Sequence, residues 1–181
     1  PHPPSIVAAM KKEGYPFKGC LYAGLMITSE GPKVVEFNCR FGDPETEAVL
    51  PLFDGDLARV MLDCVHGTLS DEAVVWKKAC AVDVRARIPK DDPASHSSGE
   101  VISGIETQKG RLPCVPCRYR QEERPVRRQW RPRADVVALA DTLAEAKAKA
   151  YEGVSRISWR GMQYRHDIAD KGFCIWRRRN K

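Results

Sequence analysis

The spacing of apolar residues along the chain predicts three amphipathic helices. Apolar positions recur at helical spacing over residues 5–13 and 56–66, and a glycine follows each run in the position typical of a helix end. A third helix is predicted from Thr142 to about Arg156, because Thr-Leu-Ala-Glu has the pattern of a capping box. The inner face of the second helix is expected to comprise Leu57, Val60, Met61 and Cys64.

Shorter apolar runs predict strands between these helices. Residues 19–28 form a compact apolar run that we expect to be a buried strand, and 34–38 alternate as its hairpin partner. Further strands are expected at 79–87, at 136–140 and, shorter, at 100–105. Residues 88–100 are rich in Pro, Asp and Ser and predict a loop, whereas Val154, Ile157, Trp159 and Tyr164 are expected in the core.

A short helix is predicted to follow the hairpin. Asp43 has the character of an N-cap, Pro44 suits the first helical position, and Glu45 places a negative charge in the first turn. Pro51 limits this helix to about two turns. The order of elements indicates an α+β protein of two units, with a boundary near residue 76.

Composition narrows the class of protein. The chain is 43% hydrophobic, yet no apolar run approaches the roughly 20 residues that span a bilayer, and the start lacks the features of a signal peptide. We therefore expect a cytoplasmic protein without a membrane partner. Seven scattered cysteines predict reduced, mostly buried thiols, and the CxxC at 114–117 lacks the second pair that a zinc ribbon needs.

The net charge of +6 belongs to one segment. Residues 111–134 hold eight Arg, no Lys and two Glu, and the rest of the chain has 22 basic and 22 acidic residues. Arginines 118–133 with interleaved Tyr119 and Trp130 leave open a nucleic-acid-binding module. We favour this alternative less, because no known binding motif is present; salt-dependent binding to single-stranded oligonucleotides would support it.

Candidate chemistry lies at the end of the second predicted strand. Glu36, Asn38 and, if the strand extends that far, Arg40 share one face. A carboxylate and an amide oxygen suit Mg²⁺, and a guanidinium can bind phosphate or carboxylate in bidentate fashion. Spacing alone would still favour a solvated strand face with a surface ion pair.

The identity of the residues favours the ligand-binding interpretation over the solvated strand face. Residues 19–26 (GCLYAGLM) and 32–45 (PKVVEFNCRFGDPE) closely resemble the glycinamide ribonucleotide synthetases, a family of ATP-grasp ligases. The resemblance extends over about 5–82, 99–114 and 135–173. Other ATP-grasp ligases or carboxylases of purine synthesis share only the E-x-N core, and tests of glycine against other carboxylates would discriminate between them.

The resemblance implies a fold and a domain order. The expected fold is the second half of an ATP-grasp domain, over 1–76 and carrying the metal site, followed by a small α+β carboxy-terminal domain over 77–173. Residues 174–181 would form a basic tail.

The resemblance also assigns roles to the site. Glu36 and Asn38 match ligands of Mg²⁺ or Mn²⁺. Arg40 matches the residue beside them, to which we assign the catalytic role of stabilising a phosphate or acyl phosphate. The turn of Gly42, Asp43, Pro44 and Glu45 would contact phosphoribosylamine or glycine. No protein nucleophile is required.

The implied reaction joins glycine to 5-phosphoribosylamine through glycyl phosphate, with hydrolysis of ATP to ADP and phosphate, in de novo synthesis of purines. The family's adenine pocket and glycine-rich phosphate loop would precede Pro1. We therefore expect the isolated chain to bind ATP weakly and to form no product; turnover by the 181 residues alone would contradict this.

Two stretches, 83–98 and 115–134, depart from the family. Permitted codons for both, read one nucleotide later, restore motifs that the family has there, such as Gly-Tyr-Pro and His-Ala-Gly-Thr. We hypothesise out-of-frame translation, through sequencing error or compensating insertions and deletions, which would also explain the excess of Arg. If the shift is real in the protein, both stretches should pack poorly. A clean reading frame, confirmed by peptide mass spectrometry, would exclude this.

Overall fold

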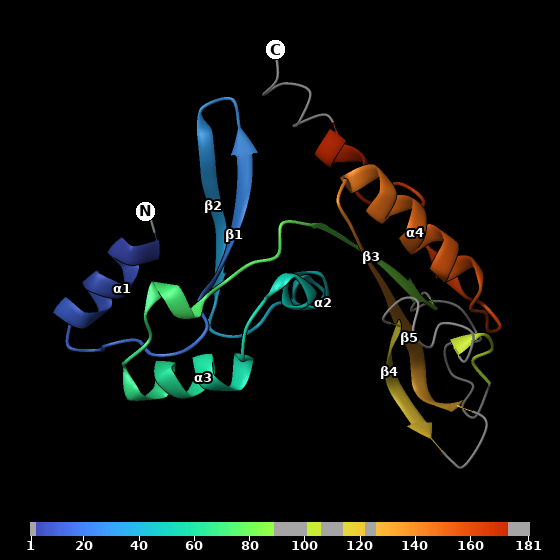
Figure 1. Ribbon diagram of the computed structural model, residues 1–181, viewed down its shortest axis with the longest axis horizontal. Helices are drawn as coiled ribbons and strands as arrows, with labels where there is room; N and C mark the ends of the chain where they lie inside the picture. The colour runs from blue at the N-terminus through green and yellow to red at the C-terminus, as the bar shows by residue number, and fades with distance from the viewer. Residues whose placement is uncertain (1–2, 89–100, 106–113, 122–125, 174–181) are drawn as a thin grey trace. The chain divides into compact units, whose positions relative to one another are not determined.

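The computed structural model describes residues 3–88, 101–105, 114–121 and 126–173 (Figure 1). It divides into two compact units. The first contains the residues up to Thr46 together with Phe53–Lys77, and the second contains Glu47–Leu52 together with the residues from Lys78 onward. The domain limits inferred from the sequence stay a prediction, and the basic tail lies outside the described residues.

The first unit consists of two helices and a β-hairpin. Helix α1 (Pro3–Lys12) ends at Gly14, which has φ of 87°, and strands β1 (Tyr22–Thr28) and β2 (Gly31–Asn38) pair antiparallel. Helix α3 (Leu57–His66) follows later in the chain. Both helices and the hairpin confirm the predictions from apolar spacing.

The ends of α3 are set by its flanking residues. The Asp56 carboxylate accepts a hydrogen bond from the Arg59 backbone N–H at 3.0 Å, and Gly67 closes the helix in the left-handed conformation, with φ of 74°. Leu57, Val60 and Cys64 are partly buried as expected, but Met61 is 43% exposed.

The predicted burial of the first hairpin strand is wrong. Leu25 is 51% exposed and Ile27 is 64% exposed. The reason is that β1 and β2 form a sheet of only two strands within the described residues, so no further strand or opposing layer removes these side chains from water.

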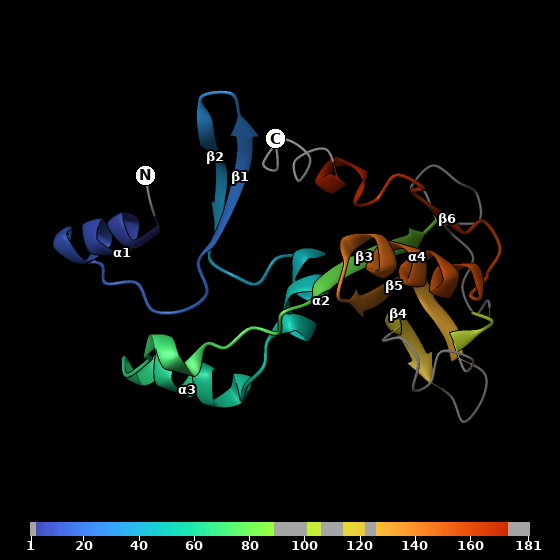
Figure 2. The same ribbon diagram turned by 45° about the horizontal axis from the view of Figure 1, so that its top comes forward.

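The second unit is built on a four-stranded sheet with the order β4-β5-β3-β6. Its strands are β3 (Cys80–Arg87), β4 (Cys114–Gln121), β5 (Val126–Ala140) and β6 (Gln163–Tyr164), and all neighbours are antiparallel. Helix α4 (Leu143–Ser155) lies along β3 and β5, as both views show (Figures 1 and 2).

The core of this unit lies between α4 and the sheet. Its most buried side chains include Val84, Val136 and Val154, each at 0% exposure, with Ile157 and Trp159 beside them. The capping box at the start of α4 is confirmed in its main contact, because the Thr142 hydroxyl accepts a hydrogen bond from the Glu145 N–H at 3.2 Å.

Two predicted strands differ in extent, and a predicted loop lies almost entirely outside the described residues. The expected strand 136–140 is the last third of the 15-residue β5. In place of a strand at 100–105, the described residues show an isolated bridge between Ser103 and Ser158. The predicted loop 88–100 lies outside the described residues except for Ile88.

The short helix after the hairpin begins one residue later than predicted. Helix α2 covers Glu45–Val49, and the 3-10 helix η1 (Leu50–Leu52) follows it at Pro51. Pro44 precedes the helix, in a turn, and is joined to Asp43 by a cis peptide bond. It therefore does not occupy the first helical position that we assigned to it.

The prediction that the stretches 83–98 and 115–134 pack poorly is wrong for the side chains that the structure describes. Val84 and Ala86 are 0% exposed and Ile88 is 4% exposed. Ala134, the partner of Ala86 on β5, is also 0% exposed. Alternate residues of β3 meet the core, which satisfies the strand period. Residues 89–98 and the side chains of 115–132 lie outside the described residues, so the frame-shift hypothesis itself stays untested.

The structure describes the side chains of four cysteines, and all four are free thiols, as expected of reduced cysteines: Cys20, Cys39, Cys64 and Cys80. None of the four is fully buried, which corrects the expectation of mostly buried thiols; Cys39, for example, lies just past the end of β2 and is exposed. The side chains at 114, 117 and 174 lie outside the described residues. Among the described helices, none has the length and apolar character needed to cross a membrane.

Candidate functional site

The two predicted metal ligands lie together on one face of β2. Glu36 and Asn38 are alternate residues of this strand, and the Asn38 side-chain amide donates a hydrogen bond to Glu36 Oε1 at 3.0 Å. The shared face that strand alternation predicted is therefore confirmed.

The neighbouring strand shapes this face. In the hairpin register Tyr22 pairs with Asn38 and Gly24 pairs with Glu36. A Cβ atom on Gly24 would approach Glu36 Cγ to 3.2 Å, so a glycine at this position leaves room for the Glu36 side chain. The register shifts immediately after Gly24, where the pleat of the two strands is irregular.

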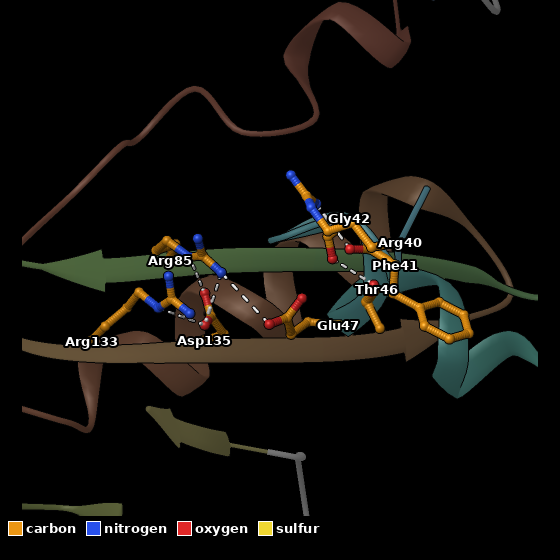
Figure 3. Close-up of polar contacts among 8 residues, drawn as sticks. All are labelled: Arg40, Phe41, Gly42, Thr46, Glu47, Arg85, Arg133 and Asp135. Carbon is orange, nitrogen blue, oxygen red and sulfur yellow. Dashed lines mark hydrogen bonds and ion pairs between the residues drawn. The ribbon is translucent and has the colours of Figure 1, made fainter. Parts of the chain in front are cut away.

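Arg40 does not continue the strand face. Strand β2 ends at Asn38, and the exposed Arg40 side chain turns so that Nη1 donates to the backbone carbonyl of Phe41 at 2.9 Å (Figure 3). The condition that the strand extends to Arg40 is thus not met. The guanidinium is accessible to a ligand, because its described hydrogen bond occupies only one of its five N–H groups.

The turn from Gly42 to Glu45 is closely packed on itself. The Gly42 carbonyl accepts hydrogen bonds from the Thr46 backbone N–H at 3.3 Å and from the Thr46 hydroxyl at 2.5 Å. Gly42 is buried, and a Cβ there would lie 2.4 Å from Glu45 Oε2. Only a glycine therefore allows the Glu45 carboxylate to fold back over this turn.

Tyr22 connects the strand face to the turn, and sequence reasoning did not assign it to the site. Its hydroxyl donates to Glu45 Oε1 at 3.4 Å, a long hydrogen bond. The pKa of Tyr22 is raised by burial first, then by the Glu45 charge and hydrogen bond and by Glu36, while Arg40 lowers it. The charges of Glu36, Arg40 and Glu45 thus all act on one phenol. The hairpin register was the available signal, because it places Tyr22 opposite Asn38.

The donor atoms fit a small divalent cation. Oxygen ligands of Mg²⁺ lie about 2.1 Å from the ion at right angles, so two adjacent ligands are about 3.0 Å apart. The Asn38 side-chain amide already lies 3.0 Å from Glu36 Oε1, and a flip of this amide would present its oxygen at that place. No group of three or more His, Cys, Asp or Glu side chains forms a metal site among the described residues. Mg²⁺ commonly takes only one or two protein oxygens and fills its other positions with water and phosphate.

Comparison with known proteins points to one family. Residues 4–46 match the model described as the ATP-grasp (A) domain of phosphoribosylglycinamide synthetase, and residues 88–171 match the model of the C domain of the same enzyme.

Two relatives and one solved structure agree with these matches. The chain is 40% identical over 168 residues to a phosphoribosylamine–glycine ligase of Neisseria meningitidis serogroup A. This match covers 91% of this chain and 39% of the relative. It is 36% identical over 170 residues to the trifunctional purine biosynthetic protein adenosine-3 of Bos taurus, covering 93% of this chain and 17% of that protein. The crystal structure of phosphoribosylamine–glycine ligase from Thermotoga maritima superimposes with a TM-score of 0.70 at 28% identity, over 88% of this chain and 39% of that one.

The matches confirm the predicted α+β fold, an ATP-grasp part followed by a C domain. The chain spans 39% of the length of the Neisseria relative. Sequence, domain order and fold agree: the chain belongs to the phosphoribosylglycinamide synthetase family.

Proposed function

We propose that this chain supplies the metal- and phosphate-binding part of an ATP-dependent ligase that joins glycine to 5-phosphoribosylamine. The observation that carries the proposal is the Glu36–Asn38 pair, 3.0 Å apart on one strand face, with Arg40 and Glu45 close enough to act on the same tyrosine. The name of the Neisseria relative, phosphoribosylamine–glycine ligase, supports the choice of substrates.

Glu36 and Asn38 would hold Mg²⁺ or Mn²⁺ through one carboxylate and one amide oxygen. A bound cation of this kind neutralises charge on the phosphates of ATP during transfer of the γ-phosphoryl group to the glycine carboxylate. The products of the whole reaction are glycinamide ribonucleotide, ADP and phosphate.

Arg40 is the proposed catalytic residue. Its exposed guanidinium can bind the transferred phosphoryl group or the acyl phosphate, whose negative charge it would stabilise. The turn of Gly42, Asp43, Pro44 and Glu45 would contact the amine or glycine substrate. In support, the Glu45 carboxylate accepts a hydrogen bond from Tyr22, the strand partner of Asn38.

Activity would require the rest of the family sequence. The chain corresponds to 39% of the Neisseria relative, and the isolated 181 residues are expected to bind ATP weakly and to give no turnover. We propose the cytoplasm as its location, in keeping with the free thiols of the cysteines that the structure describes.

Binding of Mn²⁺ to the chain tests the metal assignment directly. Electron paramagnetic resonance of added Mn²⁺ should show weak binding by the wild type and a loss of at least about tenfold in affinity for Glu36→Gln, since one of two protein ligands is neutralised. Glu30→Gln is the matched control, because Glu30 lies on the same hairpin and pairs with Lys33 at 2.9 Å. Equal binding by wild type and Glu36→Gln would contradict the assignment.

The reaction is tested in a chimera in which this chain replaces the matching segment of the Neisseria ligase. Product formation from glycine, phosphoribosylamine and ATP is expected, with Arg40→Ala lowering kcat by about 100-fold or more. Preference for another carboxylate over glycine, in a chimera that forms product, would contradict the proposed substrate.

A further inference from the structure

The second unit contains a cluster of charged residues of its own. Asp83 and Arg85 lie on β3, Arg133 and Asp135 lie on β5, and Glu47 lies on the part of α2 that belongs to this unit. We refer to these five residues as the Asp83 cluster.

Asp135 is the centre of the cluster. It is 0% exposed and accepts two hydrogen bonds from Arg85, at 2.5 Å from Nε and 3.1 Å from Nη2. Arg133 Nε lies 3.7 Å from its second oxygen (Figure 3). Arg85 and Asp135 are direct partners in the register of β3 and β5, which explains why this pair forms.

Glu47 joins α2 to the same group. Its Oε1 lies 3.7 Å from Arg85 Nη2, so Arg85 is shared between Asp135 and Glu47 (Figure 3). The Glu47 side chain is only 18% exposed, and its Oε2 is buried with no hydrogen-bond partner among the described residues.

Asp83 is the carboxylate in excess. It lies two residues before Arg85 on the same face of β3, diagonal to Asp135 across the strand pair. Its Oδ1 is buried and makes no hydrogen bond to any described residue. The groups that act on it are Glu47 from α2, Arg85 from its own strand, and Arg133 and Asp135 from β5. Among the residues whose side chains the structure describes, these make three carboxylates against two guanidiniums.

We propose that the Asp83 cluster takes up one proton on folding, carried by Asp83, and that loss of this proton weakens the attachment of Glu47–Leu52 to β3. A proton on Asp83 leaves two carboxylates facing two guanidiniums. Without it, the new charge repels Asp135 and Glu47 and competes with Glu47 for Arg85, which is the described polar link between α2 and the sheet.

The direction of the pH effect follows from the environment of Asp83. Burial first, and the Asp135 charge next, raise the pKa of Asp83 to about 7, against about 3.9 for an unfolded Asp. Between these values the folded chain binds one proton more than the unfolded chain. Stability contributed by this group is therefore complete below about pH 4, falls as the pH rises, and is lost above about pH 7.

Carbon-13 NMR of the Asp side chains tests the proposal on the full 181-residue chain. The Asp83 carboxyl, assigned through the backbone resonances of Asp83 in the wild type, should titrate near neutral pH. A midpoint near 4, the ordinary value for Asp, would overturn the proposal whether or not the variant folds.

Amide hydrogen exchange tests the structural consequence. From pH 6 to pH 8, after correction for intrinsic rates, protection of residues 47–52 in the wild type should fall several-fold, up to about tenfold in total. Asp83→Asn should flatten this dependence to within about twofold. Asp167→Asn is the control: Arg165 lowers the pKa of this exposed carboxyl, so it stays ionised over the range and its removal should leave the wild-type slope unchanged. Equal pH dependence in wild type and Asp83→Asn would overturn the proposal.

Discussion

At the scale of single residues, Asp135 shows how one buried charge depends on its neighbours. A carboxylate without exposure is costly unless paired, and Asp135 is paired with Arg85 through two hydrogen bonds and lies within 3.7 Å of Arg133. The sequence contains 24 acidic residues and does not distinguish this one from the exposed ones. Its role depends on the strand register.

Replacing Asp135 by Ala should destabilise the second unit by about 2–4 kcal/mol, because two partly buried guanidiniums would lose their carboxylate. We place the value below that of a fully buried pair because the Arg85 side chain is 21% exposed. Urea unfolding followed by circular dichroism measures the loss. Asp141→Ala, at an exposed acid that follows β5, should change the free energy of unfolding by less than about 0.5 kcal/mol. A similar small change for Asp135→Ala would contradict the pairing.

The strand face that we propose as the metal site depends on fewer tertiary details. Glu36 and Asn38 share a face because they are alternate residues of one strand, which local sequence dictates. Tyr22 reaches the same face only because the hairpin register pairs it with Asn38, and its hydrogen bond to Glu45 then spans 23 residues of sequence.

At the scale of elements, α4 illustrates how small residues allow close packing. The helix turns Ala146, Ala150, Gly153 and Val154 toward the sheet, all of them buried. Large side chains at the alanines would hold α4 away from β3 and β5, whose core residues Val84 and Val136 are themselves fully buried.

Ala150→Leu should therefore destabilise the protein by about 1–3 kcal/mol through overpacking. Ala148→Leu is the matched control on the exposed side of the same helix, where the change should stay within about 0.5 kcal/mol. Thermal or urea unfolding of the pair measures the difference. If both variants unfold alike, the close contact between α4 and the sheet is wrong.

The start of α4 gives a second test at this scale. Thr142→Ala removes the hydroxyl that accepts from the Glu145 N–H, at an expected cost of about 1 kcal/mol, whereas Thr142→Ser retains the cap and should cost only a few tenths. Chemical unfolding of both variants distinguishes a lost hydrogen bond from a general effect of substitution.

At the scale of the whole molecule, buried apolar side chains are unequally divided. All of the buried hydrophobic residues described lie between Val82 and Trp159, in the second unit. The first unit exposes large apolar side chains from several of its elements: Leu25, Met26, Ile27, Val35, Phe37, Met61, Leu62, Val65 and Trp76. Burial of apolar surface is the main source of stability, so the second unit should be more stable than the first.

We expect amide exchange of the isolated chain to be slow in β3, the described end of β5 and α4, and much faster in β1, β2 and α3. Hydrogen exchange with mass spectrometry at one pH resolves both units in a single protein, and α4 and α3, as two helices of similar length, provide an internal comparison. Protection of the hairpin equal to that of α4 would contradict the unequal division of the core.

The sequence by itself determined the features that depend on neighbours a few residues apart. These include the helix ends at Gly14 and Gly67, the cap at Thr142, the hairpin, and the pairing of Glu36 with Asn38. Local hydrogen bonds and side-chain periodicity fix all of these, which is why short stretches of sequence were enough to predict them.

Only the tertiary structure decided the features that join distant parts of the chain. The sequence predicted that the first hairpin strand is buried, whereas Leu25 and Ile27 of this strand are exposed. Nothing in the sequence indicated that Arg85 and Asp135, 50 residues apart, are strand partners, or that Glu47 lies near Arg85. Burial and charge pairing depend on which segments exclude water from one another, and that is set by strand register and packing across the fold.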